Sequence, residues 1–502
     1  MKDYKIPTLN INKFSDKEFS FYSFSARDYR KLHIVNENLI KLSDLLEEKH
    51  KAGKEIGSEN YMKKSKYRFL KTVNISRNYT LDEASIEYCK PENKVFPKKN
   101  EILIVKDGAG NGLGEVALYS YDNKENFDSL SAGIIAIDVK EDFRFYVLGI
   151  LKSQHFKDYI DINTAQGSTI RHAKLIALDY KIPFPTINNN QNPEKIEKLV
   201  SIITQNIIDK EEKINEKNKK IDELIEKELR ENQKSENNFK YAYPKISEIK
   251  KESRLDTGIY EREFKEIDFL IRNYEGGYIN FEDSGFKRKK GPNLAISVIG
   301  RSYYSDIKHN QNFKQLILSK HVTDEGGLKA NQYIGSSAKL PILKKFDFLL
   351  FARGDIGRVI LIDDILIGAT SNFDVFFISS KKQNWENIFA LCYFKYLRNI
   401  GFWEFYGVGG SGASSLTDYY FKKVNLPNFP DSKQQEIAKE YYNKINKNQN
   451  LNLDNYLELE KARNDQLGIF QLNMEIFTLR EKLEDIIDKI INDQNININL
   501  NY

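Results

Sequence analysis

Cysteine is scarce in this chain of 502 residues, which has only Cys89 and Cys392. One possible pair is too few for the disulfide framework of a secreted domain, so we expect a cytoplasmic protein. The six histidines are scattered, and none stands at metal-ligand spacing from a cysteine or another histidine, so we expect no metal site. No apolar run approaches the ~18 residues of a membrane span, and the first residues lack a signal-peptide core.

Recognisable catalytic motifs are also missing. The chain has no G-x-S-x-G, no H-E-x-x-H, no G-x-x-x-x-G-K-S/T and no Asp/Asn-Pro-Pro-Tyr, and no nuclease-like cluster of carboxylates with lysine stands out. With 40% apolar and 30% charged residues the chain is globular, and its length suits two to four domains. A net charge of +5 permits a nucleic-acid partner without demanding one. We therefore expect a binding protein without catalytic residues.

Glycine concentrates in two stretches of similar pattern. Glu101–Leu118 and Phe346–Ile362 each contain an apolar run, a glycine turn and a second apolar run. The turn glycines are Gly108, Gly110, Gly112, Gly114, Gly354 and Gly357. Glycine reaches backbone conformations that a Cβ forbids, so the pattern predicts two strands joined by a structural turn. A phosphate-binding loop is the alternative, but the dinucleotide spacing holds only from Gly112 to Ala117, where we expect a strand rather than a helix.

The remaining apolar patterns predict a mixed α/β (α+β) fold. Strands are expected within Tyr67–Ile75, Ser131–Val139 and Ser371–Phe377. Helical spacing is found in Asn36–Glu48, Phe143–Ile160, Glu261–Asn273 and Trp385–Leu397. Leu178–Pro185 and Val424–Pro430 are expected to be extended, because proline cannot continue a helix.

Two long helical regions differ in composition from the rest. Pro193–Asn232 has no glycine and no further proline, and its apolar residues recur every three or four positions, which predicts a helix of ~60 Å with a narrow apolar stripe. Lys433–Asp493 is a second region, broken near Asn446–Asn452, with an unbroken heptad from Ile469 to Ile490. A polar helix of this length needs a partner, so we expect the two regions to form an antiparallel coiled coil.

The landmarks occur twice in the same order. The distance from Gly108 to Gly167 is 59 residues and that from Gly354 to Gly412 is 58. Each of these later glycines precedes the proline of an extended segment by 18 residues, and a long helix follows. The spacing predicts two copies of a globule followed by a helix. The expected segments are a first globule at 1–187, a central helix at 188–236, a second globule at 237–430 and a helical region at 431–502.

Several loops carry residue types that suit contact with DNA. Lysine and arginine neutralise phosphates, and arginine and asparagine also reach base edges. The candidates are Asn74, Arg77, Asn78, Arg171, His172, Lys287, Arg288, Lys289, Lys290, Arg301, Tyr303 and Tyr304. A solvated loop with loose charge is the alternative at each single position. Taken as groups, the clusters favour DNA contact.

The chain resembles the specificity subunits of Type I restriction–modification systems. The resemblance rests on the two turns that close on Gly-x-Val, at Gly114-Glu115-Val116 and Gly357-Arg358-Val359, and on the glycine-containing loops before Pro185 and Pro430. The segment ESRLDTGIY, with Arg254, Asp256 and Tyr260, looks like the opening of such a domain. Gln434-Gln435-Glu436-Ile437 is similar to the start of the family's helix. The first copy departs at Asn111 and in its asparagine-rich spacer after Pro185.

The resemblance implies two target-recognition domains, each reading half of a bipartite site in double-stranded DNA. It also implies that the helices act as a ruler and dock two adenine-methylating modification subunits, to which restriction subunits are added. Catalysis, with S-adenosylmethionine, ATP and magnesium, would then belong to the partner subunits and not to this chain. A solitary methylation specificity subunit, a nucleotide-using enzyme and a coiled-coil scaffold are the alternatives.

Overall fold

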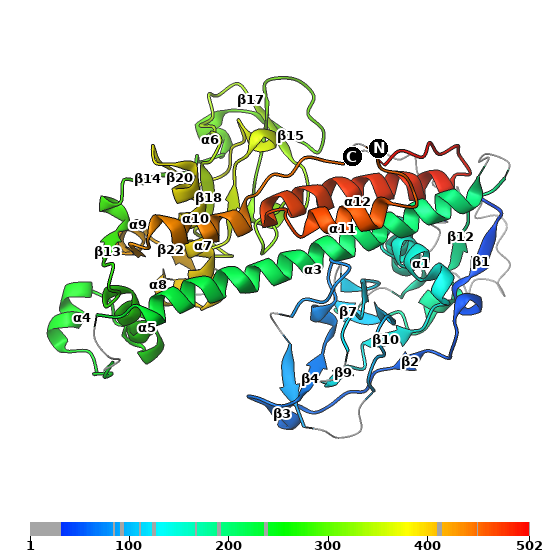
Figure 1. Ribbon diagram of the computed structural model, residues 1–502, viewed down its shortest axis with the longest axis horizontal. Helices are drawn as coiled ribbons and strands as arrows, with labels where there is room; N and C mark the ends of the chain where they lie inside the picture. The colour runs from blue at the N-terminus through cyan, green and yellow to red at the C-terminus, as the bar shows by residue number, and fades with distance from the viewer. Residues whose placement is uncertain are drawn as a thin grey trace, which may run out of the picture. The chain divides into compact units, whose positions relative to one another are not determined.

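The computed structural model describes residues 32–83, 86–90, 95–109, 112–122, 127–165, 168–187, 192–234, 239–408, 414–448 and 450–500 (Figure 1). The chain divides into two compact units. Unit 1 comprises Met1–Glu212, Asn448–Ala462 and Thr478–Tyr502, and unit 2 comprises Lys213–Lys447 and Arg463–Phe477. Both units mix helices with small sheets, as the apolar patterns predict.

The main sheet of unit 1 contains the first glycine stretch. Its four antiparallel strands have the order β2-β10-β6-β8, with bounds β2 Lys51–Ala52, β6 Ile102–Val105, β8 Val116–Leu118 and β10 Ile134–Ile137. The predicted hairpin is confirmed, because β6 pairs with β8 and places Ile102 opposite Leu118. Strand β10 lies inside the predicted strand Ser131–Val139.

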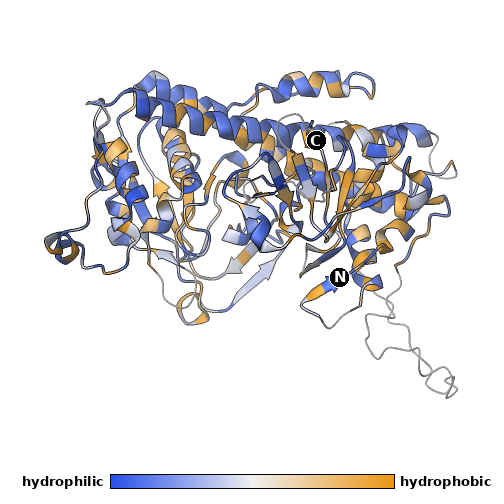
Figure 2. Cartoon of the chain, turned by 90° about the horizontal axis from the view of Figure 1, so that it is seen from below, coloured by the Kyte–Doolittle hydropathy of each residue, from blue (hydrophilic) through white to orange (hydrophobic). Residues whose placement is uncertain are grey.

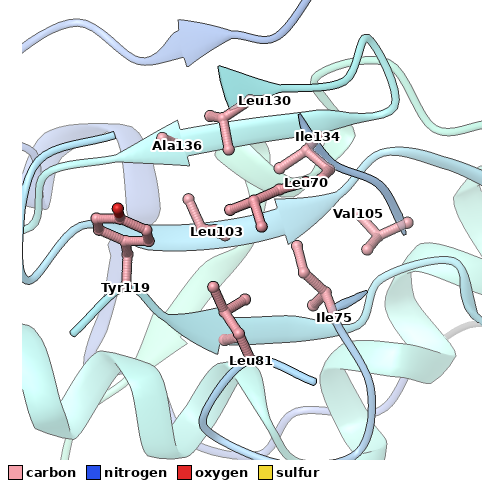
Figure 3. Packing of buried hydrophobic residues seen from close by; sticks show 10 residues of the cluster. Leu70, Ile75, Leu81, Leu103, Val105, Tyr119, Leu130, Ile134 and Ala136 are labelled. Carbon is pink, nitrogen blue, oxygen red and sulfur yellow. The ribbon is translucent and has the colours of Figure 1, made fainter. Parts of the chain in front are cut away.

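Both faces of this sheet are buried, which explains its continuous apolar runs. On one face Leu103 and Ala136 pack with Leu70 and Leu130, which belong to a second sheet (Figure 3). This second sheet has the order β3-β5-β4-β9, with bounds β3 Tyr61–Met62, β4 Tyr67–Leu70, β5 Glu87–Cys89 and β9 Phe127–Leu130. Ile102, Ile104, Ile135 and Ile137 are buried as well and alternate with the first set along their strands.

Two helices follow the main sheet, α1 at Arg144–Leu151 and α2 at Gln154–Asn163. They replace the single predicted helix Phe143–Ile160, and the break falls at Ser153, whose hydroxyl accepts from Phe156 N at 3.3 Å and caps α2. The predicted helix Asn36–Glu48 is wrong. That segment forms β1 (Leu39–Lys41) and the 3₁₀ helix η3 (Leu42–Leu45), because β1 pairs with the extended strand β12 (Lys181–Pro183).

The main sheet of unit 2 contains the second glycine stretch. Its order is β14-β20-β18-β19, again antiparallel, with bounds β14 Lys287–Lys290, β18 Phe348–Phe351, β19 Val359–Leu361 and β20 Val375–Ser379. A second sheet has the order β15-β17-β16, with bounds β15 Ser302–Ser305, β16 Phe313–Gln315 and β17 Tyr333–Ser336. Strand β13 (Tyr278–Asn280) pairs with β23 (Asn425–Pro427), as β1 pairs with β12.

Short helices complete unit 2. The predicted helices Glu261–Asn273 and Trp385–Leu397 are confirmed as α5 (Arg262–Arg272) and α7 (Asn384–Asn399). Further short helices are α4 Ile246–Glu252, α6 Ile296–Ile299, α8 Phe402–Tyr406 and α9 Asp418–Lys422. Among the described residues, further 3₁₀ helices are η4 Ser58–Asn60, η5 Thr72–Asn74, η7 Glu141–Phe143, η8 Ile176–Asp179, η9 Gly258–Tyr260, η10 Phe281–Asp283, η11 Ser319–His321 and η12 Asp364–Leu366.

The long helix α3 spans Pro193–Glu231, as predicted, and contributes residues to both units. The C-terminal region forms α10 (Asp431–Tyr441), α11 (Tyr456–Asn464) and α12 (Ile469–Ile491), so it breaks twice rather than once. Within unit 1, α3 contacts α11 through a hydrogen bond from Asn206 to the Tyr456 hydroxyl at 2.7 Å. Within unit 2, Lys217 and Lys220 of α3 bind Glu440 of α10.

Hydropathy differs between the long helices and the core strands. Figure 2 shows the long helical segments as largely hydrophilic with hydrophobic positions interspersed, whereas the strands range from hydrophobic to pale or hydrophilic. Among the helices of the described ranges, none is both long and apolar enough to cross a membrane.

Candidate nucleic-acid interface

Both glycine turns are structural. Gly114 has φ +77° and its N–H donates to Val105 O at 2.9 Å, and Gly357 has φ +81° and donates to Phe351 O at 2.9 Å. A Cβ at Gly357 would lie 2.1 Å from the Trp403 ring, and one at Gly114 would lie 3.2 Å from Ile160. Each turn leads into a strand, β8 or β19, and not into a helix whose N-terminus could bind phosphate.

The other turn glycines have looser surroundings. Gly354 has φ +75° and, like Gly112, has no atom within 4 Å of a Cβ placed on it. Gly110 lies outside the described residues, as does Asn111. Gly108 belongs to a strand, β7 (Asp107–Ala109), which pairs with β11 (Ile170–His172).

The β7–β11 ribbon brings two predicted DNA contacts to the first glycine stretch. Arg171 stands opposite Gly108, and its guanidinium binds Asp161 at 2.6 Å. His172 is exposed, and its Nδ1 lies 3.0 Å from Asp107 Oδ1. Unit 2 has a similar link, a bridge between Arg353 and Ser415, next to the hairpin β21 (Gly407–Val408) and β22 (Ser415–Leu416). The sequence predicts loops at these places, because a two- or three-residue ribbon leaves no periodic signal.

The three candidates that follow β4 differ in their surroundings. Asn74 is fully buried, its amide donates to Asp82 O at 3.1 Å, and its Oδ1 accepts from Lys71 N at 2.8 Å. The Asn78 Oδ1 accepts from Arg480 at 3.1 Å, whereas Arg77 is exposed. The structure thus leaves Arg77 at the surface and uses the Asn74 amide within its own loop, so base contact by Asn74 would require the loop to open.

The basic run forms β14, at the edge of its sheet. Arg288 turns inward, where its guanidinium binds Asp418 at 2.5 Å and lies 4.7 Å from the centre of the Phe376 ring. Lys287, Lys289 and Lys290 are exposed. Charge on an edge strand also prevents pairing with another chain, so this strand has a structural use beside phosphate contact.

Aromatic side chains lie on the second sheet of unit 2. Tyr303 and Tyr304 are 62% and 53% exposed on β15, just after the exposed Arg301. Tyr303 stands opposite Gly335, which in turn stands opposite Phe313 of β16. Because Gly335 has no side chain, the Phe313 ring covers its backbone, and a Cβ there would be 2.7 Å from the ring. The pairing therefore places Tyr303 and Phe313 on one face of the sheet, and Arg301 lies two residues before Tyr303. Such a surface is suited to stacking on bases. No sequence pattern predicts a role for Phe313, because pairing across β17 leaves no local signal.

The residues of ESRLDTGIY have structural contacts. Arg254 binds Asp256 at 2.5 Å, donates to Gly407 O at 3.0 Å and lies 4.9 Å from the centre of the Tyr420 ring. The Tyr260 hydroxyl donates to Arg254 O at 2.9 Å. The segment is therefore tied to the hairpin β21–β22 within unit 2.

Charged residues that no sequence pattern singles out lie around the two turns. They are Glu115, Lys152, Glu211 and Arg480 in unit 1, and Asp324, Arg358 and Arg398 in unit 2, and their ion pairs join segments distant in sequence. Glu115, Glu211 and Arg358 are buried, whereas Asp324 is exposed. The only signal in the sequence is the central position of Glu115 and Arg358 in the two Gly-x-Val elements. Within the described ranges, no group of three or more His, Cys, Asp or Glu side chains could hold a metal ion.

No protein-family model and no curated protein matches the chain. Among solved structures, it is similar to the S subunit of a Type I restriction–modification system from M. genitalium, with 13% identity over 93% of this chain and 98% of that one and a TM-score of 0.35. It is also similar to the HsdS subunit from Thermoanaerobacter tengcongensis, with 11% identity over 91% and 96% and a TM-score of 0.27.

Proposed function

We propose that this chain is the DNA-recognition subunit of a Type I restriction–modification complex and reads a bipartite target in double-stranded DNA. The observation that supports this most is the repeated arrangement. Each unit has a four-stranded sheet in which the glycine hairpin and the two other strands take the same order, β2-β10-β6-β8 and β14-β20-β18-β19. Two similar domains in one chain would read two half-sites and multiply their discrimination.

The similarity extends beyond the main sheets. The second sheets share the order β3-β5-β4 and β15-β17-β16, and the outer pairs β1–β12 and β13–β23 correspond. In both units two helices follow the main sheet, α1 and α2 in one and α7 and α8 in the other. We infer that each unit holds one target-recognition domain, with the domains at 1–187 and 237–430 separated by the helix at 188–236.

The charged and aromatic surfaces support DNA as the ligand. The exposed lysines of β14 suit phosphates, and Arg301, Tyr303 and Tyr304 on or beside β15 suit bases. In unit 1, Arg77 and His172 are exposed, and His172 adjoins the glycine hairpin. We propose these exposed residues as DNA contacts, and each is a position for mutation.

The helical regions would serve as spacer and dock. Helix α3 has 39 residues, and α10, α11 and α12 contact it within the units. We propose that α3 and the helical region at 431–502 form an antiparallel coiled coil that sets the distance between half-sites and binds two modification subunits. Restriction subunits would join that core. Adenine methylation and DNA cleavage, with S-adenosylmethionine, ATP and magnesium, would take place on the partners.

Mapping methylated adenines tests the function directly. The chain is expressed with its modification subunits in a host that lacks adenine methylation, and the modified positions are read across the genome. We expect one motif with two short specific parts and a non-specific spacer of fixed length. Omitting this chain should abolish the motif. Methylation at scattered or single-part sites would contradict the proposal.

A further inference from the structure

Two buried charges of opposite sign occupy the same position in the two turns. Glu115 follows Gly114 and Arg358 follows Gly357, and they are 8% and 7% exposed. The carbonyl of Glu115 accepts from Val105 N at 2.9 Å, and that of Arg358 accepts from Phe351 N at 2.9 Å. The backbone therefore places the two side chains equivalently. A buried charge is costly without a partner, so each turn needs a counter-charge nearby.

In unit 1 the counter-charges come from α2 and from the end of α1. The Lys152 ammonium is 3.8 Å from Glu115 Oε2, and Lys157 of α2 binds Glu115 Oε1 at 2.6 Å. Lys152 also donates to Ser76 O at 2.9 Å and to Asn78 O at 2.6 Å. These two carbonyls belong to residues 76–80, here called loop 1, which follows η5. The ion pair with Lys152 therefore links Glu115 to loop 1.

Loop 1 is also held by the long helices. Glu211 of α3 accepts from Thr80 N at 2.9 Å and from the Thr80 hydroxyl at 3.0 Å. Arg480 of α12 binds Glu211 and donates to Asn78 Oδ1 at 3.1 Å. The turn, loop 1 and two helices therefore share one polar network inside unit 1.

Unit 2 links the same three parts, but its turn residue is a cation and the anion lies on the loop. Residues 323–327, here called loop 2, follow η11 and carry Asp324. The Asp324 Oδ1 accepts from Arg358 at 2.8 Å and from Arg398, near the end of α7, at 2.7 Å. Arg358 also donates to Ser319 O at 3.1 Å. Loop 2 reaches the helical region too, because a Cβ at Gly327 would lie 2.6 Å from the Asn473 side chain of α12.

We propose that Glu115 and Arg358 are positioning residues that fix loop 1 and loop 2 between a glycine turn and the helices, each through ion pairs of opposite polarity. The inference rests on the proposed function for one consequence only. If the glycine turns adjoin DNA, the two residues set the geometry of half-site reading separately. Neither residue is proposed to touch DNA.

Hydrogen exchange on the full chain tests the anchoring without DNA. Glu115→Gln should speed exchange of the loop 1 amides, Thr80 among them, roughly ten-fold and leave loop 2 unchanged. Arg358→Gln should do the reverse, affecting Thr323 and Gly327, whose N–H groups are bonded inside loop 2. Arg358→Lys, which keeps the charge, should restore much of the protection. Glu48→Gln breaks an exposed ion pair with Lys98 and is the matched control. Unchanged loop exchange, or equal change in both loops, would overturn the anchoring.

Half-site discrimination tests the positioning role. Methylation is compared on targets altered in one half-site or in the other. Glu115→Gln and Arg358→Gln should each lower the discrimination against altered targets at least several-fold at one half-site. The affected half-site should differ between the two variants. If loop exchange speeds up but the preference for the intact target over each altered target stays as in the unmutated chain, the positioning role is refuted and the anchoring role stands. If no bipartite site is methylated even by the unmutated chain, the proposed function fails, and the exchange data still decide the anchoring.

Discussion

Lys152 holds its ammonium group inside unit 1 against two backbone carbonyls, those of Ser76 and Asn78. Burial lowers the pKa of Lys152 to about 7, against the opposing attraction of Glu115, while Lys157 and Arg480 lower it and Glu211 raises it. The group therefore changes charge near neutral pH, unlike an ordinary lysine. Its hydrogen bonds to the carbonyls survive as a neutral amine, which can still donate.

The pH dependence of stability should reveal this lysine. Between pH 7 and about 10.5 the unfolded chain binds the proton and the folded chain does not, so the free energy of unfolding rises with pH, by at most about 1.4 kcal/mol per pH unit. Lys152→Met should lose this part of the slope. Urea unfolding at pH 7.5 and 9.5 measures it. Lys289→Met, at an exposed position of β14, should keep the wild-type slope, and equal slopes in all three proteins would contradict the assignment.

At the scale of elements, the hairpins show why two glycines in one turn have different roles. Gly354 and Gly357 both have positive φ, but only Gly357 is packed against Trp403. Gly114 is packed less tightly, because a Cβ there would lie 3.2 Å from Ile160. The glycine of Gly-x-Val is thus required by conformation and by space, whereas Gly354 is favoured by conformation alone.

Alanine substitutions at Gly354 and Gly357 separate the cost of the backbone conformation from the cost of the steric clash. Gly354→Ala should lower the free energy of unfolding by about 1–2 kcal/mol, because only the left-handed backbone is strained. Gly357→Ala should lower it by about 2–5 kcal/mol, since the new methyl group also displaces the buried Trp403 ring. Chemical denaturation of both variants checks the difference. Equal losses would show that the tryptophan moves without cost.

The hairpins and long helices could be predicted from sequence because their signals are local. The apolar runs around each glycine turn and the three- and four-residue rhythm of α3 need no knowledge of distant segments. The helix expected at Asn36–Glu48 failed for the opposite reason. Leu39–Lys41 has a helical pattern, but it pairs with Lys181–Pro183, more than a hundred residues away. Tertiary pairing overrides local preference there.

In the candidate site, too, some residues could be predicted from local sequence and others could not. Basic runs and exposed aromatics could be selected by residue type, and β14 and β15 carry them at the surface. The burial of Asn74 could not be foreseen, because it depends on bonds to its own folded loop. The anchors Glu211 and Arg480 are separated by 269 positions and meet only in the folded unit. A single sequence without aligned relatives holds no trace of such pairs.

At the scale of the whole molecule, the proposed function depends on a fixed distance between two readers. Each added base pair of B-DNA moves one half-site by about 3.4 Å and turns it by about 34°. A rigid helical spacer cannot follow both changes. The half-sites would then be read together at one spacing only.

Targets with altered spacers test this dependence. Once the bipartite motif is known, one base pair is inserted into its non-specific part, and methylation by the complex is measured. We expect a loss of at least ten-fold. Replacing spacer bases without changing the length is the control and should have little effect. Equal methylation of both lengths would show that the spacer is flexible.

The reversed charges at Glu115 and Arg358 also bear on how such a chain avoids misassembly. Chains with two similar domains risk exchanging equivalent segments during folding. If loop 2 docked beside the turn of unit 1, Asp324 would compete with Glu115 for Lys152 and Lys157. If loop 1 docked beside the turn of unit 2, it would bring no carboxylate to the buried Arg358, because residues 76–80 include none. Each wrong pairing leaves a charge without its counter-charge, so the ion pairs favour the docking of each loop in its own unit.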